Sequence, residues 1–412
     1  MTKKMIFGRY DYATFLCLCA YACCSVVIPV SLVPLALSLN FPLEDGGMGL
    51  GGVLQIARSS SMVFAMLFCG FLAGRWGKAR SLGLALLCMS AGILGAAISP
   101  FYGLLFCMLV IAGLGEGVIE GLATPVVQDL HPDEPGRYIN FSHGFWSVGV
   151  LGMVLIAGLL LNLGVNWRWI TAGAGIFTLV PALMYLIPSK KSPYPAVRET
   201  FRAAEVWRNS VDILKRGRFW LFFAAMFLAG GGEYCLTFWC ASFIKLEYNS
   251  SMWDAGLGTA VFAGGMIVGR LGSGYLVRQK ALKELIVLSA LAATAITLTF
   301  PFLRSLPVLF MLLFLSGIFI GPFWPSVQSY CATRMTVDNT MLFILLSCAG
   351  VPGAGICTML MGILGDAVGL KMSFFLVPGC FILMTLLIGL DWAEGRHHVM
   401  KRLKRRTLLR TE

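Results

Sequence analysis

The sequence has few charged residues for its length. Only 13% of the 412 residues are Asp, Glu, Lys or Arg, whereas 58% are hydrophobic. A soluble globular protein carries about 25% charged residues, so this chain has too few to cover the surface of a soluble fold of its size. The composition therefore excludes a cytosolic enzyme, a secreted disulfide scaffold and a disordered chain, and it leaves a polytopic membrane protein.

The signatures of soluble enzymes are also missing. The sequence contains no Walker phosphate-binding loop, no HExxH, no GxSxG and no dinucleotide-binding fingerprint on a strand. The 13 cysteines show no zinc-binding spacing, and nearly all lie in apolar segments, where cysteine packs as a small hydrophobic residue. We therefore expect that the protein is not an enzyme, that it does not pump by ATP hydrolysis on its own, and that it has neither cofactor nor metal.

Long hydrophobic runs are what the sequence does contain. A membrane-spanning helix needs about 20 mostly apolar residues, and we identify twelve candidates. They lie at residues 12–38, 49–73, 81–99, 102–128, 139–163, 167–187, 219–245, 254–277, 282–302, 306–330, 340–364 and 371–391. The first is expected to be a retained span and not a signal peptide, because it is far longer than a signal-peptide core.

The longest polar interval divides the spans into six and six. We predict an all-α membrane protein of two pseudo-symmetric six-helix bundles around a central site. The expected parts are a first bundle at residues 1–187, a central cytoplasmic loop at 188–218, a second bundle at 219–391 and a basic cytoplasmic tail at 392–412.

Lys and Arg are distributed unevenly over the predicted loops. If the N-terminus is cytoplasmic, 26 of the 32 lie on the cytoplasmic side, four in outer loops and two inside spans. This bias predicts that both termini are cytoplasmic and that the protein lies in the inner membrane of the cell. The basic tail would attract anionic membrane lipid. The net charge of +12 then reflects topology, and we expect no nucleic-acid partner.

Three acidic residues lie near the middle of predicted spans: Glu116, Glu120 and Glu233. A charge at the bilayer centre is costly and persists when it is paired, protonated or facing a water-filled cavity. Glu116 and Glu120 are four residues apart and share one helix face. All three are candidates for proton coupling, and the alternative is a static ion pair with Arg58.

Two cations also lie within spans. Arg58 follows Gln55 by nearly one helical turn and precedes three serines, so it belongs to a polar patch. It could bind an anionic substrate or neutralise one of the nearby glutamates, and the sequence leaves both possibilities open. For Arg270 we expect a structural role, either reaching the membrane surface or capping a neighbouring helix end.

Aromatic and amide side chains cluster at a similar predicted depth. Such residues can hydrogen-bond polyols and stack on sugar rings, although an interfacial aromatic belt or ordinary packing gives the same pattern. Together with Gln55 and Arg58, the expected substrate-binding residues are Asn140, His143, Trp146, Tyr234, Trp239, Trp324 and Gln328.

Glycine recurs every fourth residue in two predicted spans. One span carries Gly113, Gly117 and Gly121, and another carries Gly265 and Gly269. This spacing allows two helix backbones to approach closely, so we expect these faces to be helix–helix contacts.

The loop after the second span resembles a motif of the major facilitator superfamily. It reads from Gly70 through Arg75, Gly77 and Lys78, with Gly74 at the position where the motif usually has an acid. The resemblance implies two six-helix bundles and a gating role for this loop.

Three further segments are similar to the fucose–galactose–glucose/H⁺ symporter branch of that superfamily. Glu120 precedes Pro125 by five residues, the stretch from Asn140 to Phe145 follows, and Glu233 precedes Trp239 by six residues. The segment Gly321-Pro-Phe-Trp-Pro325 adds support. The resemblance implies alternating access and places the coupling carboxylate on Glu120.

These observations predict a monomeric transporter that moves a sugar or related small polar solute together with H⁺, with Na⁺ as the other possible coupling ion. A first alternative is transport of an organic anion through Arg58, or efflux of amphipathic compounds, by the same fold. A second is a membrane sensor or scaffold that transports nothing.

Overall fold

The computed structural model describes residues 5–132, 135–188, 194, 203–277, 281–335, 337 and 339–391. In this part of the chain, twelve helical segments are long and apolar enough to cross a membrane, which confirms the predicted number. The spans are α1 (Arg9–Val30), α3 (Met48–Trp76), α4 (Lys78–Ile98), α5 (Tyr102–Leu130), α6 (Pro135–Asn162), α7 with α8 (Trp167–Phe177 and Leu179–Leu186), α10 (Gly217–Glu247), α11 (Met252–Leu276), α12 (Leu282–Thr297) with η3 (Phe300–Phe302), α13 with α14 (Leu306–Ile320 and Phe323–Arg334), α15 (Asn339–Val368), and Leu370–Asp391, which begins with α16 (Leu370–Ser373).

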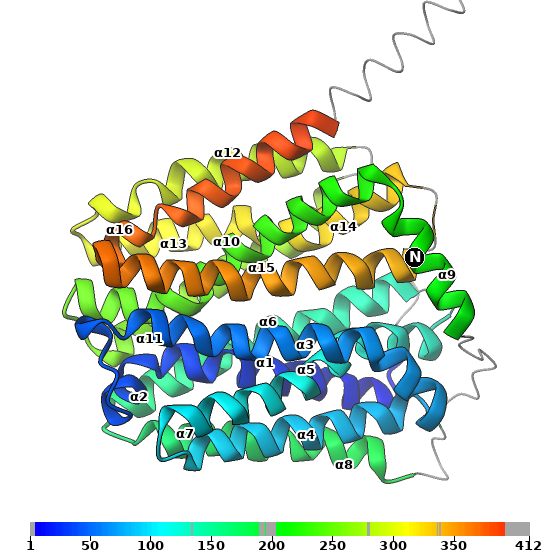
Figure 1. Cartoon of the computed structure of the whole chain (residues 1–412), viewed down its shortest axis with the longest axis horizontal. Coiled ribbons are helices and arrows are strands. Elements are labelled where there is room, and N and C mark those ends of the chain that lie inside the picture. The colour runs from blue at the N-terminus through cyan, green and yellow to red at the C-terminus, as the bar shows by residue number, and fades with distance from the viewer. Residues whose placement is uncertain are drawn as a thin grey trace, which may run out of the picture.

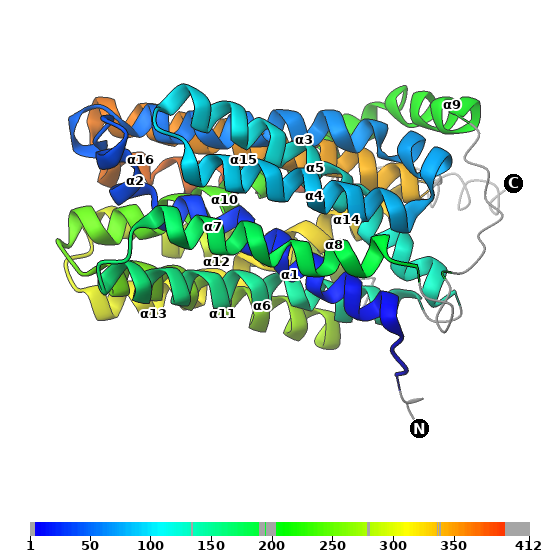
Figure 2. The same ribbon diagram turned by 90° about the horizontal axis from the view of Figure 1, so that it is seen from below.

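The helices run roughly parallel to one long axis and form two halves. Figure 1 shows most of the blue and cyan helices on one side and the yellow to red helices on the other, and Figure 2 shows the same bundle from below. The halves meet where α3 packs against α15, α6 against α11 and α1 against α10. Residues from both halves can therefore meet along the middle of the molecule.

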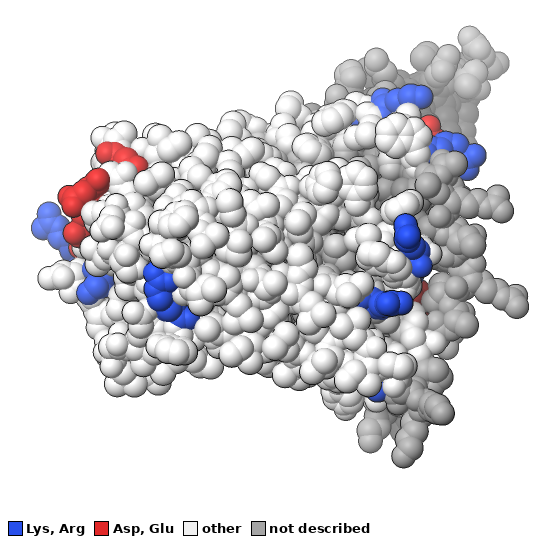
Figure 3. Space-filling view, turned by 60° about the horizontal axis from the view of Figure 1, so that its bottom comes forward, with Lys and Arg blue, Asp and Glu red and all other residues white. Residues whose placement is uncertain are grey.

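On the surface, most charged side chains lie near the two ends of the bundle. Figure 3 shows a wide band with almost no charge between them, as expected for a surface that faces lipid. We call the end that holds the start of α1 and the turn between α3 and α4 the basic end. The opposite end, which holds the start of α3 and the end of α15, is the far end.

Three short elements lie between the spans. The segments α2 (Leu32–Ser38) and η1 (Leu43–Asp45) connect α1 to α3, and α9 (Ala203–Leu214) precedes α10. The helix α9 was not expected, because the interval 188–218 was predicted as a loop. It lies at the basic end, where Ile213 is buried and the Trp207 side chain is 73% exposed.

One span is broken near its middle by proline. Pro322 follows the last turn of α13, and Pro325 lies in the first turn of α14. In a continuous helix the carbonyl of Gly321 would accept a hydrogen bond from the N–H of residue 325, but proline has no N–H. The break therefore leaves the Gly321 carbonyl without a helical donor, deep in the bundle.

The predicted glycine contacts are present. A Cβ atom on Gly117 would lie 2.2 Å from the Met62 carbonyl oxygen of α3, and one on Gly113 would lie 2.5 Å from the Arg58 carbonyl oxygen. In the other half, Cβ atoms on Gly265 and Gly269 would each lie 2.1 Å from a carbonyl oxygen of α13. These contacts bring α5 onto α3, which carries Arg58, and α11 onto α13, whose broken end lies next to Arg270.

We expect Gly117→Ala to destabilise the protein. The added methyl group meets backbone atoms of Met62 that cannot move aside, and overpacking of this kind costs about 1–3 kcal/mol. The matched control is Gly152→Ala, because a Cβ atom there would meet nothing within 4 Å. Thermal unfolding of both purified variants in detergent measures the difference, and equal melting temperatures would contradict the close contact between α3 and α5.

Candidate functional site

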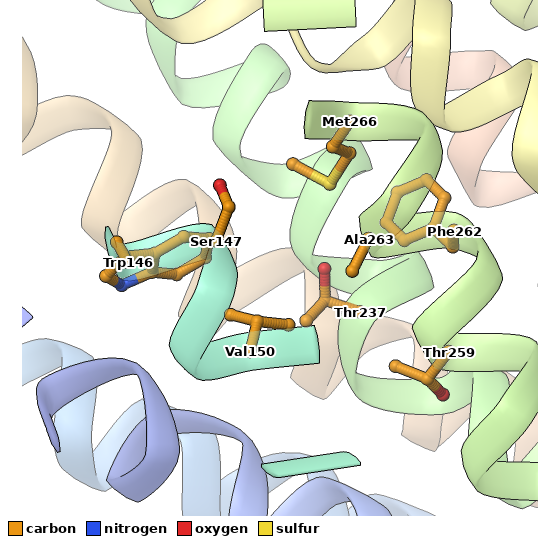
Figure 4. A pocket seen from close by; sticks show the side chains of 8 residues that line it. All are labelled: Trp146, Ser147, Val150, Thr237, Thr259, Phe262, Ala263 and Met266. Atoms are coloured by element: carbon orange, nitrogen blue, oxygen red, sulfur yellow. The ribbon is translucent and has the colours of Figure 1, made fainter. Parts of the chain in front are cut away.

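A small cavity lies between the two halves, near the middle of the bundle. Trp146, Ser147 and Val150 of α6 form one wall, Thr237 of α10 contributes a second, and α11 supplies a third with Thr259, Phe262, Ala263 and Met266 (Figure 4). Its volume of about 10 Å³ is close to the minimum that one water molecule needs. The cavity as it stands therefore holds no more than about one water molecule, and a larger solute requires its walls to move apart.

An ion pair lies beside this cavity. Arg270 of α11 donates from Nη2 to Oε1 of Glu233 on α10 at 2.9 Å, and its guanidinium carbon lies 5.6 Å from the centre of the Trp146 ring. Glu233 is buried, and its second oxygen, Oε2, has no hydrogen-bond partner among the described residues. A buried acceptor without a partner is costly, so this oxygen is suited to accept a hydrogen bond from a bound solute.

The proline break explains the position of Arg270. Its Nε donates to the Gly321 carbonyl oxygen at 3.0 Å, the carbonyl that Pro325 leaves without a helical donor. The prediction that Arg270 caps a neighbouring helix end is confirmed by this bond. The ion pair with Glu233 was missed, although the two prolines in α13–α14 and the scarcity of intramembrane cations were signals for it.

Glu120 lies across from this pair on α5. It is half-buried, and it interacts with the Tyr21 hydroxyl of α1. The positive charge of Arg270 attracts the Glu120 carboxylate electrostatically. Among the described residues Glu120 forms no ion pair. His143 is exposed, and its Nε2 lies 2.9 Å from the Thr124 hydroxyl. The charge of Arg270 also affects the His143 ring electrostatically. Glu120 and His143 of the first half therefore lie within electrostatic range of Arg270 of the second.

The Glu116 side chain has other partners than Glu120. It forms a bidentate ion pair with Arg58, whose Nε and Nη2 both donate to it. Arg58 also donates to the carbonyl oxygens of Cys24 and Ser25 at 3.0 and 3.3 Å, and its side chain is only 2% exposed. Of the two open possibilities for Arg58, the structure shows neutralisation of a glutamate, and that glutamate is Glu116.

Two more candidate residues lie near Arg58. Gln55 is buried and donates to the Ser59 hydroxyl at 3.3 Å, while its Oε1 lacks a partner among the described residues. The Tyr234 hydroxyl lies 2.8 Å from the Ser25 hydroxyl and so connects α10 to α1. The side chain of Asn140, another candidate, lies outside the described residues.

Three candidates are packed against helices and do not border the cavity. The Trp239 indole is fully buried, and its N–H donates to the Thr358 carbonyl oxygen at 3.0 Å. Trp324 packs on Gly350, and Gln328 donates to the Ser347 hydroxyl at 3.2 Å, so both lie against α15. A role for these side chains in substrate binding stays a prediction.

The loop motif forms the turn from α3 to α4 at the basic end. Gly70 and Arg75 lie in the last turns of α3, and Gly77 has φ +81°, a conformation that other residues adopt only with strain. Lys78 forms an ion pair with Asp129 at 2.8 Å, and the Tyr194 hydroxyl also donates to Asp129. Burial and this hydrogen bond raise the pKa of Tyr194. The motif thus ties α4 to the end of α5.

Within the described residues, no group of His, Cys, Asp or Glu side chains is arranged to hold a metal ion. The arrangement instead offers a proton-accepting carboxylate, an unsatisfied acceptor and an aromatic face. Groups of this kind can bind a small polar solute and take up a proton.

The chain resembles known membrane proteins in sequence and in fold. The family model described as Major Facilitator Superfamily matches residues 13–353. Among curated proteins, the membrane protein MosC of Rhizobium meliloti is 23% identical over 327 residues, 79% of this chain and 77% of that protein. Solved structures that share the fold include the E. coli fucose:proton symporter (TM-score 0.66, 16% identity, 92% of this chain and 98% of that one) and a D-xylose-proton symporter (TM-score 0.74, 13% identity, 92% and 96%).

Proposed function

Because this chain belongs to the major facilitator superfamily and is a multi-pass membrane transporter, we propose that it imports a sugar or a related neutral polar solute together with a proton. The two bundles, residues 1–187 and 219–391, would rock about the central cavity so that the site opens to one side of the membrane at a time. The coupling ion is H⁺ in this proposal, and Na⁺ is the alternative to be excluded by experiment.

The observation that carries this proposal is the charge balance around the cavity. Arg58 is paired with Glu116, and Arg270 with Glu233, so each cation already has a carboxylate. Glu120 is a third carboxylate, and it has no ion pair in the described part of the chain. Binding a proton to Glu120 makes the set neutral, which lowers the cost of closing the site away from water. This makes Glu120 the proposed coupling residue.

The same balance favours a neutral solute with hydroxyl groups. Oε2 of Glu233 needs a donor, Trp146 presents an aromatic face, and Thr237 and Thr259 line the cavity. Hydroxyl groups and a sugar ring meet these needs. We retain as proposed substrate contacts the other candidates from the sequence, namely Gln55, Asn140, His143, Tyr234, Trp239, Trp324 and Gln328. The fucose and D-xylose named for the two structural neighbours belong to this class of solute.

An organic anion fits the site less well. Arg58 was its expected contact, but the Arg58 side chain is buried and uses Nε, Nη1 and Nη2 in bonds to Glu116 and to two carbonyl oxygens. An anion would have to displace Glu116 from this pair. Arg270 is likewise occupied by Glu233 and the Gly321 carbonyl. We therefore favour the neutral solute.

The basic end suggests how the protein is oriented in the membrane. We propose that this end faces the cytoplasm of a cell with the protein in its inner membrane, since Lys and Arg concentrate on cytoplasmic loops. The tail from residue 392 would then lie at the cytoplasmic surface, close to anionic lipid. We propose a monomer as the functional unit, because each chain contains a complete central site.

A binding screen tests the substrate class. Purified protein is heated with members of three groups: neutral sugars including fucose and D-xylose, organic acids, and amphipathic cations. We expect a sugar to raise the unfolding temperature, and more so at a pH at which Glu120 is protonated. Stabilisation by organic acids alone would support the anion alternative and overturn our assignment.

Trp146→Ala should weaken binding of the best sugar from this screen. The change removes an aromatic face that lines the cavity and supports Arg270, and we expect Kd to rise about tenfold, equivalent to about 1.4 kcal/mol. Trp220→Ala is the control, because Trp220 of α10 is 51% exposed, does not line the cavity, and donates its indole N–H to the Leu214 carbonyl. Isothermal titration compares the two variants. An unchanged Kd for Trp146→Ala would assign this side chain to packing.

A further inference from the structure

The helix α3 begins at the far end without a cap from its own sequence. The first N–H groups of a helix have no partner within the helix, and the residue before α3 is Gly47, which has no side chain to supply one. A carboxylate from the other half takes this place. Met48 N–H donates to Oδ1 of Asp366 at 2.8 Å, and Gly49 N–H donates to Oδ2 at 2.6 Å.

Asp366 is poorly placed for the helix that carries it. It lies in the last turn of α15, where the helix dipole disfavours a negative charge, whereas the start of α3 favours one. Its stabilising partners are therefore in the first half of the molecule. Gly49 makes the approach possible, since a Cβ atom there would lie 2.9 Å from Oδ2 of Asp366.

The two helices are in direct backbone contact below these bonds. A Cβ atom on Gly52 of α3 would lie 2.6 Å from Cα of Met359, and one on Gly362 of α15 would lie 2.3 Å from the Met48 carbonyl oxygen. No side chain separates α3 from α15 at these points. Opening the far end must pull these backbones apart, and it must also break both hydrogen bonds to Asp366.

We propose that Asp366 and the first two N–H groups of α3 form a latch between the halves that sets how much of the protein is closed at the far end. This inference rests on the proposed alternation of the two bundles and adds a positioning residue to it. Asp366 touches neither the cavity nor Glu120. It acts through the position of α3 relative to α15, and the latch has to open and close again in each transport cycle.

The latch should have a measurable effect on the conformational equilibrium. Hydrogen bonds from N–H groups to a carboxylate are stronger than those between neutral groups, and they exist in only one of the two conformations. We expect Asp366→Asn, which keeps the shape but removes the charge, to lower the ratio of closed to open far end about five- to tenfold.

Hydrogen exchange monitored by mass spectrometry tests this without a substrate. In Asp366→Asn we expect faster exchange at the far end, in residues 48–59 and 355–366, and slower exchange at the basic end, in residues 66–76 and 121–130. The control is Glu247→Gln, which removes an exposed carboxylate from the last residue of α10, also at the far end. It should leave exchange unchanged at both ends.

Opposite changes in the hydrogen-exchange rate at the two ends distinguish a latch from a local helix cap. Faster exchange at the far end alone would mean that Asp366 only stabilises the first turn of α3, and no change at either end would mean that it does neither. Both results overturn the latch. Neither affects the proposed sugar and proton transport, which is tested separately through Glu120. Asp366→Ala provides a second variant, and it should shift exchange in the same directions.

Discussion

We expect Glu120→Gln to abolish proton-driven accumulation of the solute and to leave exchange of solute across the membrane intact. Glutamine has nearly the size of glutamate and imitates its protonated form, so the site stays neutral and able to bind and reorient. It cannot release a proton, and a pH gradient then has nothing to act on. Among the described residues, Glu120 is the acid near the cavity without an ion pair, which is why the largest loss is expected there.

The measurement uses proteoliposomes that contain the purified protein. Uptake of labelled sugar is followed under an imposed pH gradient, and exchange is followed with equal sugar on both sides. Glu44→Gln serves as control, because it removes an exposed carboxylate at the far end. We expect accumulation in Glu120→Gln to fall at least about a hundredfold while exchange changes little. If Glu120→Gln still accumulated sugar, the coupling carboxylate would be another residue.

Glu116→Leu should be the most destabilising of the single changes considered. It leaves the Arg58 charge buried without its carboxylate, and breaking a buried ion pair by removing one partner costs about 3–5 kcal/mol. The double variant Arg58→Met with Glu116→Leu should recover most of the loss, because it removes both charges and keeps the volume. Thermal unfolding in detergent measures all three proteins.

An exposed pair provides the comparison. Lys283 and Glu284 form an ion pair with side chains that are 30% and 52% exposed, and loss of such a pair costs about 0–1 kcal/mol. Glu284→Leu should therefore hardly change the melting temperature. If Glu116→Leu were equally harmless, or if the double variant were no more stable than the single one, the Arg58–Glu116 pair would not be the structural element described above.

The spans and their number could be predicted because the bilayer imposes a length on each helix. Hydropathy also isolates the few charges that lie inside spans, so Arg58, Glu116, Glu120 and Glu233 were identifiable from sequence. The sequence could not show which acid pairs with which cation. Glu116 and Glu120 share a helix face and differ only in the side chains that other helices place opposite them.

The position of Arg270 shows what pairing depends on. Its contacts need the α11–α13 glycine packing and the carbonyl that Pro325 leaves free on Gly321, and both involve residues distant in sequence. The sequence contains each signal, but only the packed bundle brings them together. The spacing from Glu233 suggested a substrate contact for Trp239. The structure shows its indole N–H bonded to the Thr358 carbonyl oxygen, and a role in substrate binding stays a prediction.

The helix α9 was missed for a simpler reason. Its residues are too polar to resemble a span, and a search for apolar runs of about 20 residues passes over it. Apolar residues nevertheless recur every three to four positions from Ala203 to Leu214, which is the pattern of a helix lying along a surface. Applying that pattern to the central loop would have predicted it.

Proton movement during sugar entry decides whether the protein is a proton-coupled symporter. Proteoliposomes with a pH-sensitive dye inside, and no initial pH gradient, are mixed with fucose, D-xylose and other neutral sugars outside. We expect at least one sugar to make the interior more acidic as it enters, and we expect Glu120→Gln to abolish this signal while sugar exchange continues. Sugar entry without acidification, or with alkalinisation, would contradict proton-coupled symport.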